Sequence, residues 1–521
     1  MLKSIPVLVF LTLPFISIAQ VAPEIQWQQT YGSSAADGAR AIKVTSDGGY
    51  IVAGSTAAND GDVSGYHGGT DDAWVLKLDA LGAMQWQHAF GGTGTDNATD
   101  IYQTSDGGYI VAAATNSIDG DVSANQGSFD AWLIKLDANG NLEWQRTYGG
   151  SSSDGASSVV QTEDGGYVFA GSTGSNDGDV TGNHGGADYW VVKLDENGDI
   201  EWQKALGGTG YESAEDIQKS SDGGYIISGT SGSSDGDISD PQGGTDMWVV
   251  KLNPAGDLEW ERSLGGPSIE NGWTITQTQD GGYITAGDAS GSSFACSNGS
   301  SSFYVAKLDS SGETEWQRTC LGGSGNDQAI GVVQTMDGGF AVAGSTGSDD
   351  GDVSFNHGMS DAWVVRLDPD GNSLWERTYG GSQTDRFTSI LVTSDGGYSL
   401  AGFSSSSDGD VTENKGQNDL WVVKLGPDHV GIAQREAQPL FSLSPNPASE
   451  VVSIHFEQAL PVEVRLKLLD AQGRHLATPH EGNVVATGSD VQFSVAHLPA
   501  GMYAVQLISE GGIWTQRFVK E

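Results

Sequence analysis

Aspartate is the residue whose spacing in this sequence most directly suggests chemistry. Six times, a DGD motif is followed by a third aspartate nine positions after the second one. The triplets are Asp60, Asp62 and Asp71; Asp119, Asp121 and Asp130; Asp177, Asp179 and Asp188; Asp235, Asp237 and Asp246; Asp350, Asp352 and Asp361; and Asp408, Asp410 and Asp419. Carboxylates grouped in this way are hard oxygen ligands that suit calcium, with backbone carbonyls completing the shell. The sequence therefore predicts calcium as a cofactor of these loops.

The same aspartates also have a structural interpretation. Asp-Gly is common turn chemistry, and aspartates stabilise loops by accepting hydrogen bonds from backbone amides. The spacing lacks the glycine at the sixth position and the glutamate at the twelfth position of an EF-hand loop. Both hypotheses, structural aspartates and bound calcium, therefore stay open at this point.

A second set of acids accompanies the triplets. Each lies ten residues before the aspartate of a DGGY motif or a close variant of it. The set is Asp37, Asp96, Asp154, Glu212, Glu270, Asp327 and Asp385. If both sets lie on one face of the protein, that face carries up to four carboxylates per repeat.

The DGGY motif shows which elements must position these acids. Its aspartates are Asp47, Asp106, Asp164, Asp222, Asp280, Asp337 and Asp395, so the motif recurs every 57 to 59 residues. A fixed period of this size indicates a repeated supersecondary unit. Within residues 156–208, four short segments rich in β-branched and aromatic residues (SSVVQT, YVFAGST, YWVVKL and DIEWQKAL) are separated by turn residues. Four strands per repeat are typical of one blade of a β-propeller.

The tryptophans indicate how the ring closes. A fourth-strand tryptophan recurs at Trp27, Trp86, Trp144, Trp202, Trp260, Trp316 and Trp375, and a third-strand aromatic recurs at Trp74, Trp132, Trp190, Trp248, Tyr304, Trp363 and Trp421. The propeller thus begins with a fourth strand and ends on a third strand. We expect the segment around Trp27 to complete the last blade, which removes an exposed sheet edge. The predicted fold is all-β: a seven-bladed propeller over residues 20–428.

In such blades, the DGGY turns lie on one face and the DGD loops and blade-to-blade loops lie on the other. The recurring tryptophans could stack on sugars, but their register favours a role in the core between blades. A basic row, Lys77, Lys135, Lys193, Lys251, Lys307, Arg366 and Lys424, is similarly expected to pair with carboxylates of neighbouring strands. Four residues break the repeat and are expected to line the central channel: Arg40, Tyr211, Trp273 and Arg386.

The fifth repeat departs from the pattern. Its loop has lost all three acids and contains Cys296, while Cys320 follows the fourth strand of the same blade. These are the two cysteines of the chain. We predict a Cys296–Cys320 disulfide, which an oxidising exported environment permits.

Composition limits the partners of the protein. With 68 acidic and 24 basic residues the net charge is −44, which argues against nucleic acid and anionic membrane surfaces. Residues 1–19 combine a lysine, an apolar run and a small-x-small site, which predicts a secretory signal peptide. The apolar run is short for a membrane span, and none follows it.

The C-terminal segment differs from the repeats. Residues 429–440 are predicted to be a linker, and residues 441–521 alternate strands and turns in the manner of a small Ig-like β-sandwich. This sandwich resembles the type A sorting domain of the type IX secretion system in its SPNPA motif, LLDAQGR turn, LPAGMY motif and terminal RFVKE. The repeats are also similar to those of other exported bacterial propellers, a group without one shared activity. The resemblance implies contact with the secretion machinery and passage through the periplasm to the cell surface or medium.

Three functions remain open from the sequence. The first is a non-enzymatic propeller whose acidic loop face binds an extracellular glycan, protein or calcium. The second is a glycan-active enzyme, such as a polysaccharide lyase or a glycoside hydrolase, although HExxH and P-loop motifs are absent. The third is a structural component of a surface layer. Near-identical repeats favour binding over catalysis, because catalysis needs local asymmetry.

Overall fold

The computed structural model describes residues 22–290, 294, 301–428, 441–456, 463–470, 475–483, 490–509 and 512–521. The chain divides into two compact units, Met1–Val430 and Gly431–Glu521. The described residues form strands and no helix, so the predicted all-β class is confirmed. They accordingly contain no helix long and apolar enough to cross a membrane.

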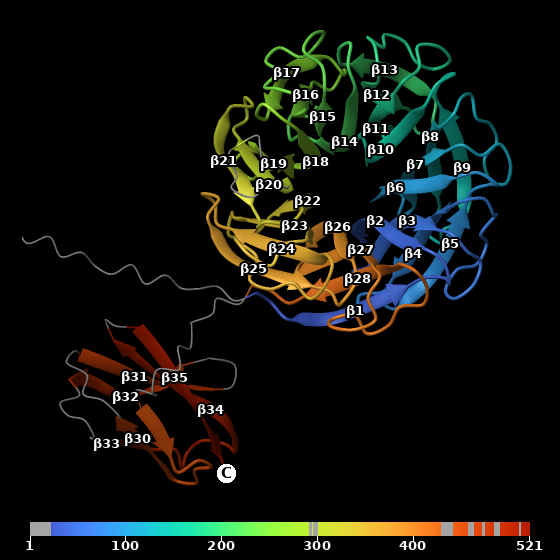
Figure 1. Cartoon of the computed structure of the whole chain (residues 1–521). Helices are drawn as coiled ribbons and strands as arrows, with labels where there is room; N and C mark the ends of the chain where they lie inside the picture. The colour runs from blue at the N-terminus through green and yellow to red at the C-terminus, as the bar shows by residue number, and fades with distance from the viewer. Residues whose placement is uncertain are drawn as a thin grey trace, which may run out of the picture. The chain divides into compact units, whose positions relative to one another are not determined.

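The first unit contains seven four-stranded antiparallel sheets arranged as blades around a centre (Figure 1). The first strands are β2 (Asp37–Val44), β6 (Asp96–Gln103), β10 (Asp154–Gln161), β14 (Glu212–Lys219), β18 (Glu270–Gln277), β22 (Asp327–Gln334) and β26 (Asp385–Val392). The second strands are β3 (Tyr50–Thr56), β7 (Tyr109–Thr115), β11 (Tyr167–Thr173), β15 (Tyr225–Ser231), β19 (Tyr283–Ser290), β23 (Phe340–Thr346) and β27 (Tyr398–Ser404). The third strands are β4 (Asp72–Leu78), β8 (Asp130–Leu136), β12 (Asp188–Leu194), β16 (Asp246–Leu252), β20 (Ser301–Leu308), β24 (Asp361–Leu367) and β28 (Asp419–Leu425). The fourth strands are β5 (Met84–Phe90), β9 (Leu142–Tyr148), β13 (Ile200–Leu206), β17 (Leu258–Leu264), β21 (Thr314–Leu321), β25 (Ser373–Tyr379) and, for the last blade, β1 (Ile25–Tyr31). The predicted seven-bladed propeller is confirmed.

The N-terminal strand closes the ring as predicted. β1 pairs antiparallel with β28, so the seventh sheet has the order β1-β28-β27-β26. The indole Nε1 of Trp421 donates a hydrogen bond to the side chain of Gln28 at 2.6 Å. The edge that β28 would otherwise expose is therefore covered by a segment almost 400 positions away in sequence.

The core lies between the blades. Third strands such as β4 are buried along their whole length, and Trp74 has no exposed surface. Fourth-strand tryptophans pack edge-on against the DGGY tyrosine of the next blade: the rings of Trp27 and Tyr50 are 5.8 Å apart. The tryptophans at the positions equivalent to Trp74 and Trp27 therefore belong to the core, as their spacing predicts.

The DGGY motif forms the tight turn between the first and second strands. In the first copy, Gly48 has a φ of 82°, a conformation that favours glycine. The hydroxyl of Thr45 and the ammonium of Lys77 both bond the carboxylate of Asp47, and they lower its pKa to about 2. The whole basic row pairs with the turn aspartates of its own blades, at 2.5 to 3.1 Å. The DGGY motif and the basic row therefore have structural roles.

The first strands lie innermost and the fourth strands outermost (Figure 1). Each first strand contacts the first strands of the two neighbouring blades, including β2 with β26 across the point of closure. Side chains that leave these strands toward the centre therefore meet residues from other blades.

The second unit consists of two sheets. One has the order β29-β30-β33 and the other the order β32-β31-β34-β35. The strands are β29 (Phe441–Ser444), β30 (Val451–Phe456), β31 (Glu463–Asp470), β32 (His475–Asn483), β33 (Asp490–Ser494), β34 (Gly501–Ser509) and β35 (Gly512–Lys520). Residues of both sheets, including Ile454 and Val505, form one buried core, so the predicted small sandwich is confirmed.

Candidate functional site

The first aspartate of each DGD motif stabilises the loop that joins the preceding blade to the blade that contains the motif. Asp60 accepts hydrogen bonds from the backbone N–H and the hydroxyl of Ser34, both at 2.7 Å. The corresponding backbone bonds, at 2.6 to 2.8 Å, are accepted by Asp119, Asp177, Asp235, Asp350 and Asp408. This arrangement supports the structural hypothesis for these carboxylates.

The second aspartate of each motif also bonds that connecting loop. Asp62 accepts the backbone N–H of Gly32 at 3.1 Å, and the amine of Lys415 lies 2.5 Å from the same carboxylate. The equivalent glycine bonds, at 3.0 to 3.3 Å, are accepted by Asp121, Asp179, Asp237, Asp352 and Asp410. Since Lys415 belongs to the seventh blade and Asp62 to the first, this second carboxylate also links neighbouring blades.

The third aspartate opens the third strand and is buried. It is the predicted residue in five blades: Asp130, Asp188, Asp246, Asp361 and Asp419. In the first blade the structure has Asp72 at this position, so the prediction of Asp71 was wrong by one residue. The loop of the first repeat is one residue longer, so the third aspartate lies ten positions after the second one and not nine. Asp71 itself is half-buried and forms a β-bridge with Thr95.

One oxygen of each of these six buried carboxylates has no hydrogen-bond partner within the described chain. In Asp130, Oδ2 accepts the backbone N–H of Gln126 at 2.7 Å, but the buried Oδ1 accepts nothing. A Cβ on Gly149 would lie 2.8 Å from this Oδ1 and 2.7 Å from Oδ2 of Asp154, the acid of the next connecting loop. Gly32, Gly91, Gly207 and Gly265 have the same position, because a Cβ on each would lie close to two acids. We call these pairs, of which Asp130 and Asp154 are one, the seam carboxylates.

The third-strand aspartate of each seam pair is poorly suited to being charged, because burial raises its pKa. Burial, together with the charge of the neighbouring acid, raises the pKa of Asp130 and of Asp419 to about 6. Among the described residues, no three His, Cys, Asp or Glu side chains gather where they could hold a metal ion. The arrangement offers two carboxylates per seam, and calcium binding stays a prediction.

The central channel has a different character. Every first strand carries a β-bulge at its fourth residue, which is left out of the pairing with the second strand. The seven bulged residues are Arg40, Thr99, Ser157, Glu215, Trp273, Ile330 and Thr388, and all of them line one cavity of about 260 Å³. Bulges redirect side chains and are frequent beside functional sites. We call these seven residues the bulge ring.

The bulge ring is asymmetric, unlike the rest of the repeat. It places a guanidinium, a carboxyl, an indole, an aliphatic side chain and three hydroxyls around one cavity. Thr99 and Thr388 use their hydroxyls to bond carbonyl oxygens of their own and the neighbouring blade, so they hold first strands together. Arg40, Glu215 and Trp273 are the distinctive members that remain for a ligand.

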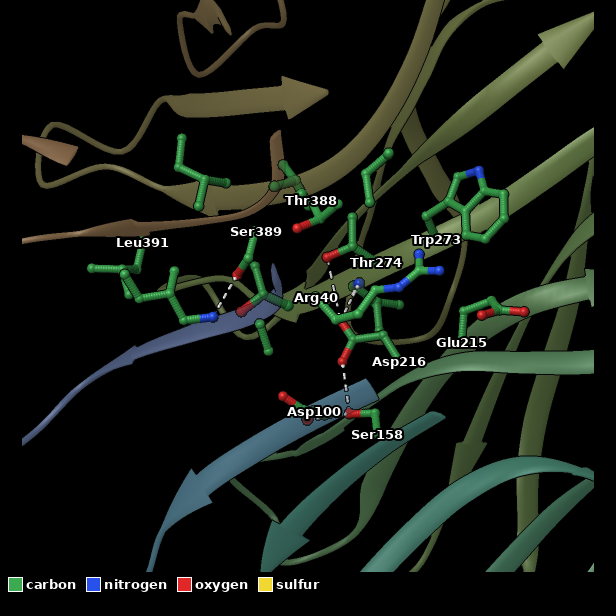
Figure 2. Close-up of a pocket in the computed structure, with 18 of the residues that line it drawn as sticks. Arg40, Asp100, Ser158, Glu215, Asp216, Trp273, Thr274, Thr388, Ser389 and Leu391 are labelled. Atoms are coloured by element: carbon green, nitrogen blue, oxygen red, sulfur yellow. Dashed lines mark hydrogen bonds between the residues drawn. The ribbon is translucent and has the colours of Figure 1, made fainter. Parts of the chain in front are cut away.

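Glu215 and Arg40 influence each other inside this ring. Burial raises the pKa of Glu215 to about 7, while the hydroxyl of Ser213 and the charge of Arg40 act in the opposite direction. Figure 2 shows the Arg40 side chain extending toward Glu215 and Trp273. The site therefore holds a carboxyl group that can change its charge near neutral pH.

Deeper in the channel, polar groups satisfy one another. Asp100 forms an ion pair with Lys43 at 3.2 Å and accepts the hydroxyl of Ser158 at 2.9 Å. Asp216 accepts the backbone N–H of Ile275 at 2.9 Å and the hydroxyl of Thr274 at 3.2 Å (Figure 2). These bonds cross between blades and form a floor below the bulge ring.

Trp273 is held in place by a residue of its own blade. Its Nε1 donates a hydrogen bond of 2.6 Å to Asp288, which is buried and also accepts bonds from Asn271 and Ser301. The positions equivalent to Asp288 in the other second strands are Ser55, Ala114, Ser172, Thr230, Ser345 and Phe403. The fifth blade has therefore changed at two contacting positions.

Three of the four predicted channel residues line a cavity. Arg40 and Trp273 line the cavity of about 260 Å³ that the bulge ring surrounds, which we call the main cavity, and Arg386 lines a second cavity that shares Arg40. Tyr211 does not line either one: it lies in a connecting loop, is 59% exposed and bridges to Ala187, so that prediction was wrong. Its position before β14 places it outside the strand that faces the centre.

Sequence reasoning missed Glu215, Asp288 and the bulge ring itself. A signal was present, because every bulged residue lies seven positions before its DGGY aspartate. Cys320 lies in β21, whereas Cys296 lies outside the described residues. The predicted disulfide between them stays a prediction.

The fold and the C-terminal unit together define an exported, propeller-like protein. Residues 442–521 match the family described as the secretion system C-terminal sorting domain. The chain thus carries a type IX secretion sorting domain, which directs export to the cell surface or secretion.

Comparison with solved structures gives weak likenesses. PorZ, an essential surface component of the type IX secretion system of Porphyromonas gingivalis, is 12% identical, with 98% of this chain and 76% of that chain covered and a TM-score of 0.32. Puromycin hydrolase is 13% identical, with 83% and 62% covered and a TM-score of 0.43. A β-xylosidase/α-arabinofuranosidase from a compost microbial metagenome is 14% identical, with 56% and 98% covered and a TM-score of 0.31. No curated protein matches the sequence. Likenesses at this level carry no argument about activity.

Proposed function

We propose that this exported propeller binds an extracellular saccharide in its central channel without transforming it. The observation that carries the proposal is the bulge ring: seven equivalent positions enter one cavity, and their residues differ from blade to blade. Sugars combine an apolar ring face with many hydroxyls. Aromatic side chains such as Trp273 suit the ring face, while Arg40, Ser157 and Glu215 supply donors and acceptors for the hydroxyls.

The place of the site on the propeller fits this proposal. Each bulged residue lies three positions inside the end of the first strand that follows the acidic connecting loop. The ligand therefore enters from the predicted acidic face. The loop aspartates are occupied in holding the blades together, so the channel, rather than the loops, is the better binding site. A cavity of about 260 Å³ suits a small saccharide or the end of a longer chain.

The proposal is tested by screening the full-length protein on a glycan array and measuring the affinity of each positive sugar by calorimetry. Trp273→Ala is expected to weaken binding about tenfold or more, because it removes the aromatic face. Tyr211→Ala is the matched control, since Tyr211 is an exposed aromatic residue outside the cavity. Equal losses in both variants, or no sugar bound by the wild type, would contradict the proposal.

A glycan-active enzyme is the second candidate, and Glu215 favours it. A carboxyl group with a pKa of about 7 can serve as a general acid or base near neutral pH. Incubating each bound sugar with the protein and analysing the products separates the two functions. A binder leaves the sugar intact, whereas an enzyme yields products that disappear in Glu215→Gln while binding persists.

A further inference from the structure

Two arginines meet at the mouth of the channel. Arg40 is on β2 of the first blade and Arg386 is on β26 of the seventh blade, and these two strands are in contact. Both side chains line the second cavity, of about 220 Å³, which shares Arg40 and Thr388 with the main cavity. The arginines therefore stand where a ligand in the bulge ring would extend toward the acidic face.

Neither arginine forms an ion pair with a carboxylate of the described residues. The basic row and most other cations of the propeller have carboxylate partners, although acids greatly outnumber bases in the chain. Arg40 and Arg386 form no ion pair or hydrogen bond within the part of the chain that is described, and Nε of Arg386 is buried without a partner. A protein with so many acids would be expected to pair these two groups if their role were only structural.

Nearby acids are close to the arginines but form no ion pair with them. Glu215 interacts with the charge of Arg40 across the main cavity, without a hydrogen bond or ion pair between the two side chains. Asp37 lines the same cavity, but its oxygens accept bonds from Ser33 and Thr56. Asp288 is engaged by Trp273, and Asp71 lines the cavity without an ion pair to either arginine. Burial and the charge of Arg40 lower the pKa of Arg386, and the charge of Asp288 offsets only part of this effect, so the two guanidinium groups repel each other in the unliganded protein.

We propose that Arg40 and Arg386 form a clamp for an anionic group on the saccharide that the bulge ring binds. Guanidinium groups recognise carboxylates with paired, charge-assisted hydrogen bonds, and the incoming anion relieves the repulsion between the two cations. The ligand class is therefore an acidic sugar, with its ring on Trp273 and its anionic group between the arginines. The net negative charge of the protein disfavours polyanions. The clamp therefore selects a saccharide whose anionic group is confined to the end that enters the channel.

This inference rests on the proposed function, and its test keeps the two apart. The full-length protein is titrated calorimetrically with a trimer that ends in a single uronic acid, with the same trimer after reduction of its carboxylate to an alcohol, and with a counterpart that carries a single terminal sulfate. The acidic form is expected to bind about tenfold or more tightly than its reduced counterpart. A preference for the carboxylate or for the sulfate identifies the anionic group.

Variants locate the effect. Arg386→Gln should lower the affinity for the acidic trimer to that of the reduced trimer, while the affinity for the reduced trimer stays unchanged, because Arg386 lies outside the bulge ring. Arg40→Gln should also abolish the preference for the acidic trimer, and it should weaken the reduced trimer as well because Arg40 bonds the sugar hydroxyls. Arg262→Gln, which alters a fourth-strand arginine paired with Glu313, is the control. Thermal melting checks that the variants fold, and removing one of two repelling cations should not lower the melting temperature. Equal binding of acidic and reduced trimers overturns the clamp but leaves saccharide binding intact; failure of all sugars to bind overturns both.

Discussion

Trp273 donates its indole N–H to Asp288 over 2.6 Å, and both residues replace smaller or different ones found in the other blades. The contact joins a bulge-ring residue on β18 to a buried carboxylate on β19 of the same blade. The hydrogen bond between these two changed residues fixes the position of the indole. The fifth blade thus departs from the repeat at two residues that contact each other, one of which lines the main cavity.

We expect Asp288→Ala to disturb the channel without unfolding the propeller. The change leaves the indole N–H and the Asn271 amide without their acceptor, at a cost of about 1–3 kcal/mol in the free energy of unfolding. It should also weaken sugar binding, because Trp273 loses its fixed orientation. The measurements are chemical denaturation and calorimetric titration. Thr230→Ala, at the equivalent position in the fourth blade, is the control and should leave affinity unchanged.

Two seam aspartates, Asp130 and Asp419, predict that stability falls as the pH rises through about 6. The pKa of Asp130 and of Asp419 is raised to about 6 in the folded protein, above the value near 4 of an unfolded chain. Groups with a raised folded pKa stabilise the fold below the unfolded pKa, and this contribution is lost as the pH passes the folded value. Each contributes about 2–3 kcal/mol at most. The melting temperature should therefore be higher at pH 5 than at pH 8.

Asparagine substitution isolates this effect. Asp130→Asn mimics the protonated acid, so it should raise the melting temperature at pH 8 and have little effect at pH 5. Asp349→Asn, in an exposed loop, should change neither value. The predicted calcium is tested in the same series: if it occupies the seams, calcium should stabilise the wild type at pH 8, and less so the variant. Identical melting in calcium and in chelator would remove the calcium hypothesis.

The DGGY turns predict the opposite behaviour in acid. Hydrogen bonds and ion pairs lower the pKa of Asp47, Asp106, Asp164, Asp222 and Asp280 to about 2. A depressed folded pKa stabilises the fold above the unfolded value, and that stability is lost as the pH falls from about 4 toward 2. Acid titration followed by circular dichroism should show unfolding in this range. Asp164→Asn should shift it only slightly, because the other turns remain.

Ring closure by β1 predicts a specific failure on truncation. Deleting residues 22–31 would expose the edge of β28 and leave the indole N–H of Trp421 without Gln28. An uncovered edge strand recruits other chains, so we expect dimers or aggregates in size-exclusion chromatography. A variant in which the β1 sequence IQWQQTY is exchanged for LEWQRTY, the β9 sequence, should stay monomeric, unlike the deletion, because all fourth strands share this pattern. A monomeric deletion variant would argue against closure by β1.

The repeat made the fold predictable from the sequence, because a constant period places every strand once one blade is understood. The DGD and DGGY motifs were assigned to opposite faces for the same reason. Asp71 was chosen in place of Asp72 because a count of positions cannot register one inserted loop residue. The bulge ring was missed because a bulge depends on how two strands pair, and the residue types at Glu215 or Trp273 do not reveal it. The shared cavity of Arg40 and Arg386 brings together the two ends of the propeller sequence, so it could not be predicted without the closed ring.

The pair of Arg40 and Glu215 provides a last prediction, which also separates binding from catalysis. Burial holds the pKa of Glu215 at about 7, and the positive charge of Arg40 opposes that rise. Arg40→Gln should therefore raise the pKa of Glu215 further, which infrared titration of the carboxyl band can follow, with Glu215→Gln to assign the band. If the protein only binds its ligand, affinity alone should vary with pH around 7. If Glu215 transfers a proton, the turnover rate should change with the same pKa and shift upward in Arg40→Gln. A Glu215 pKa that stays the same in Arg40→Gln would show that the two groups do not share the site in the way the geometry indicates.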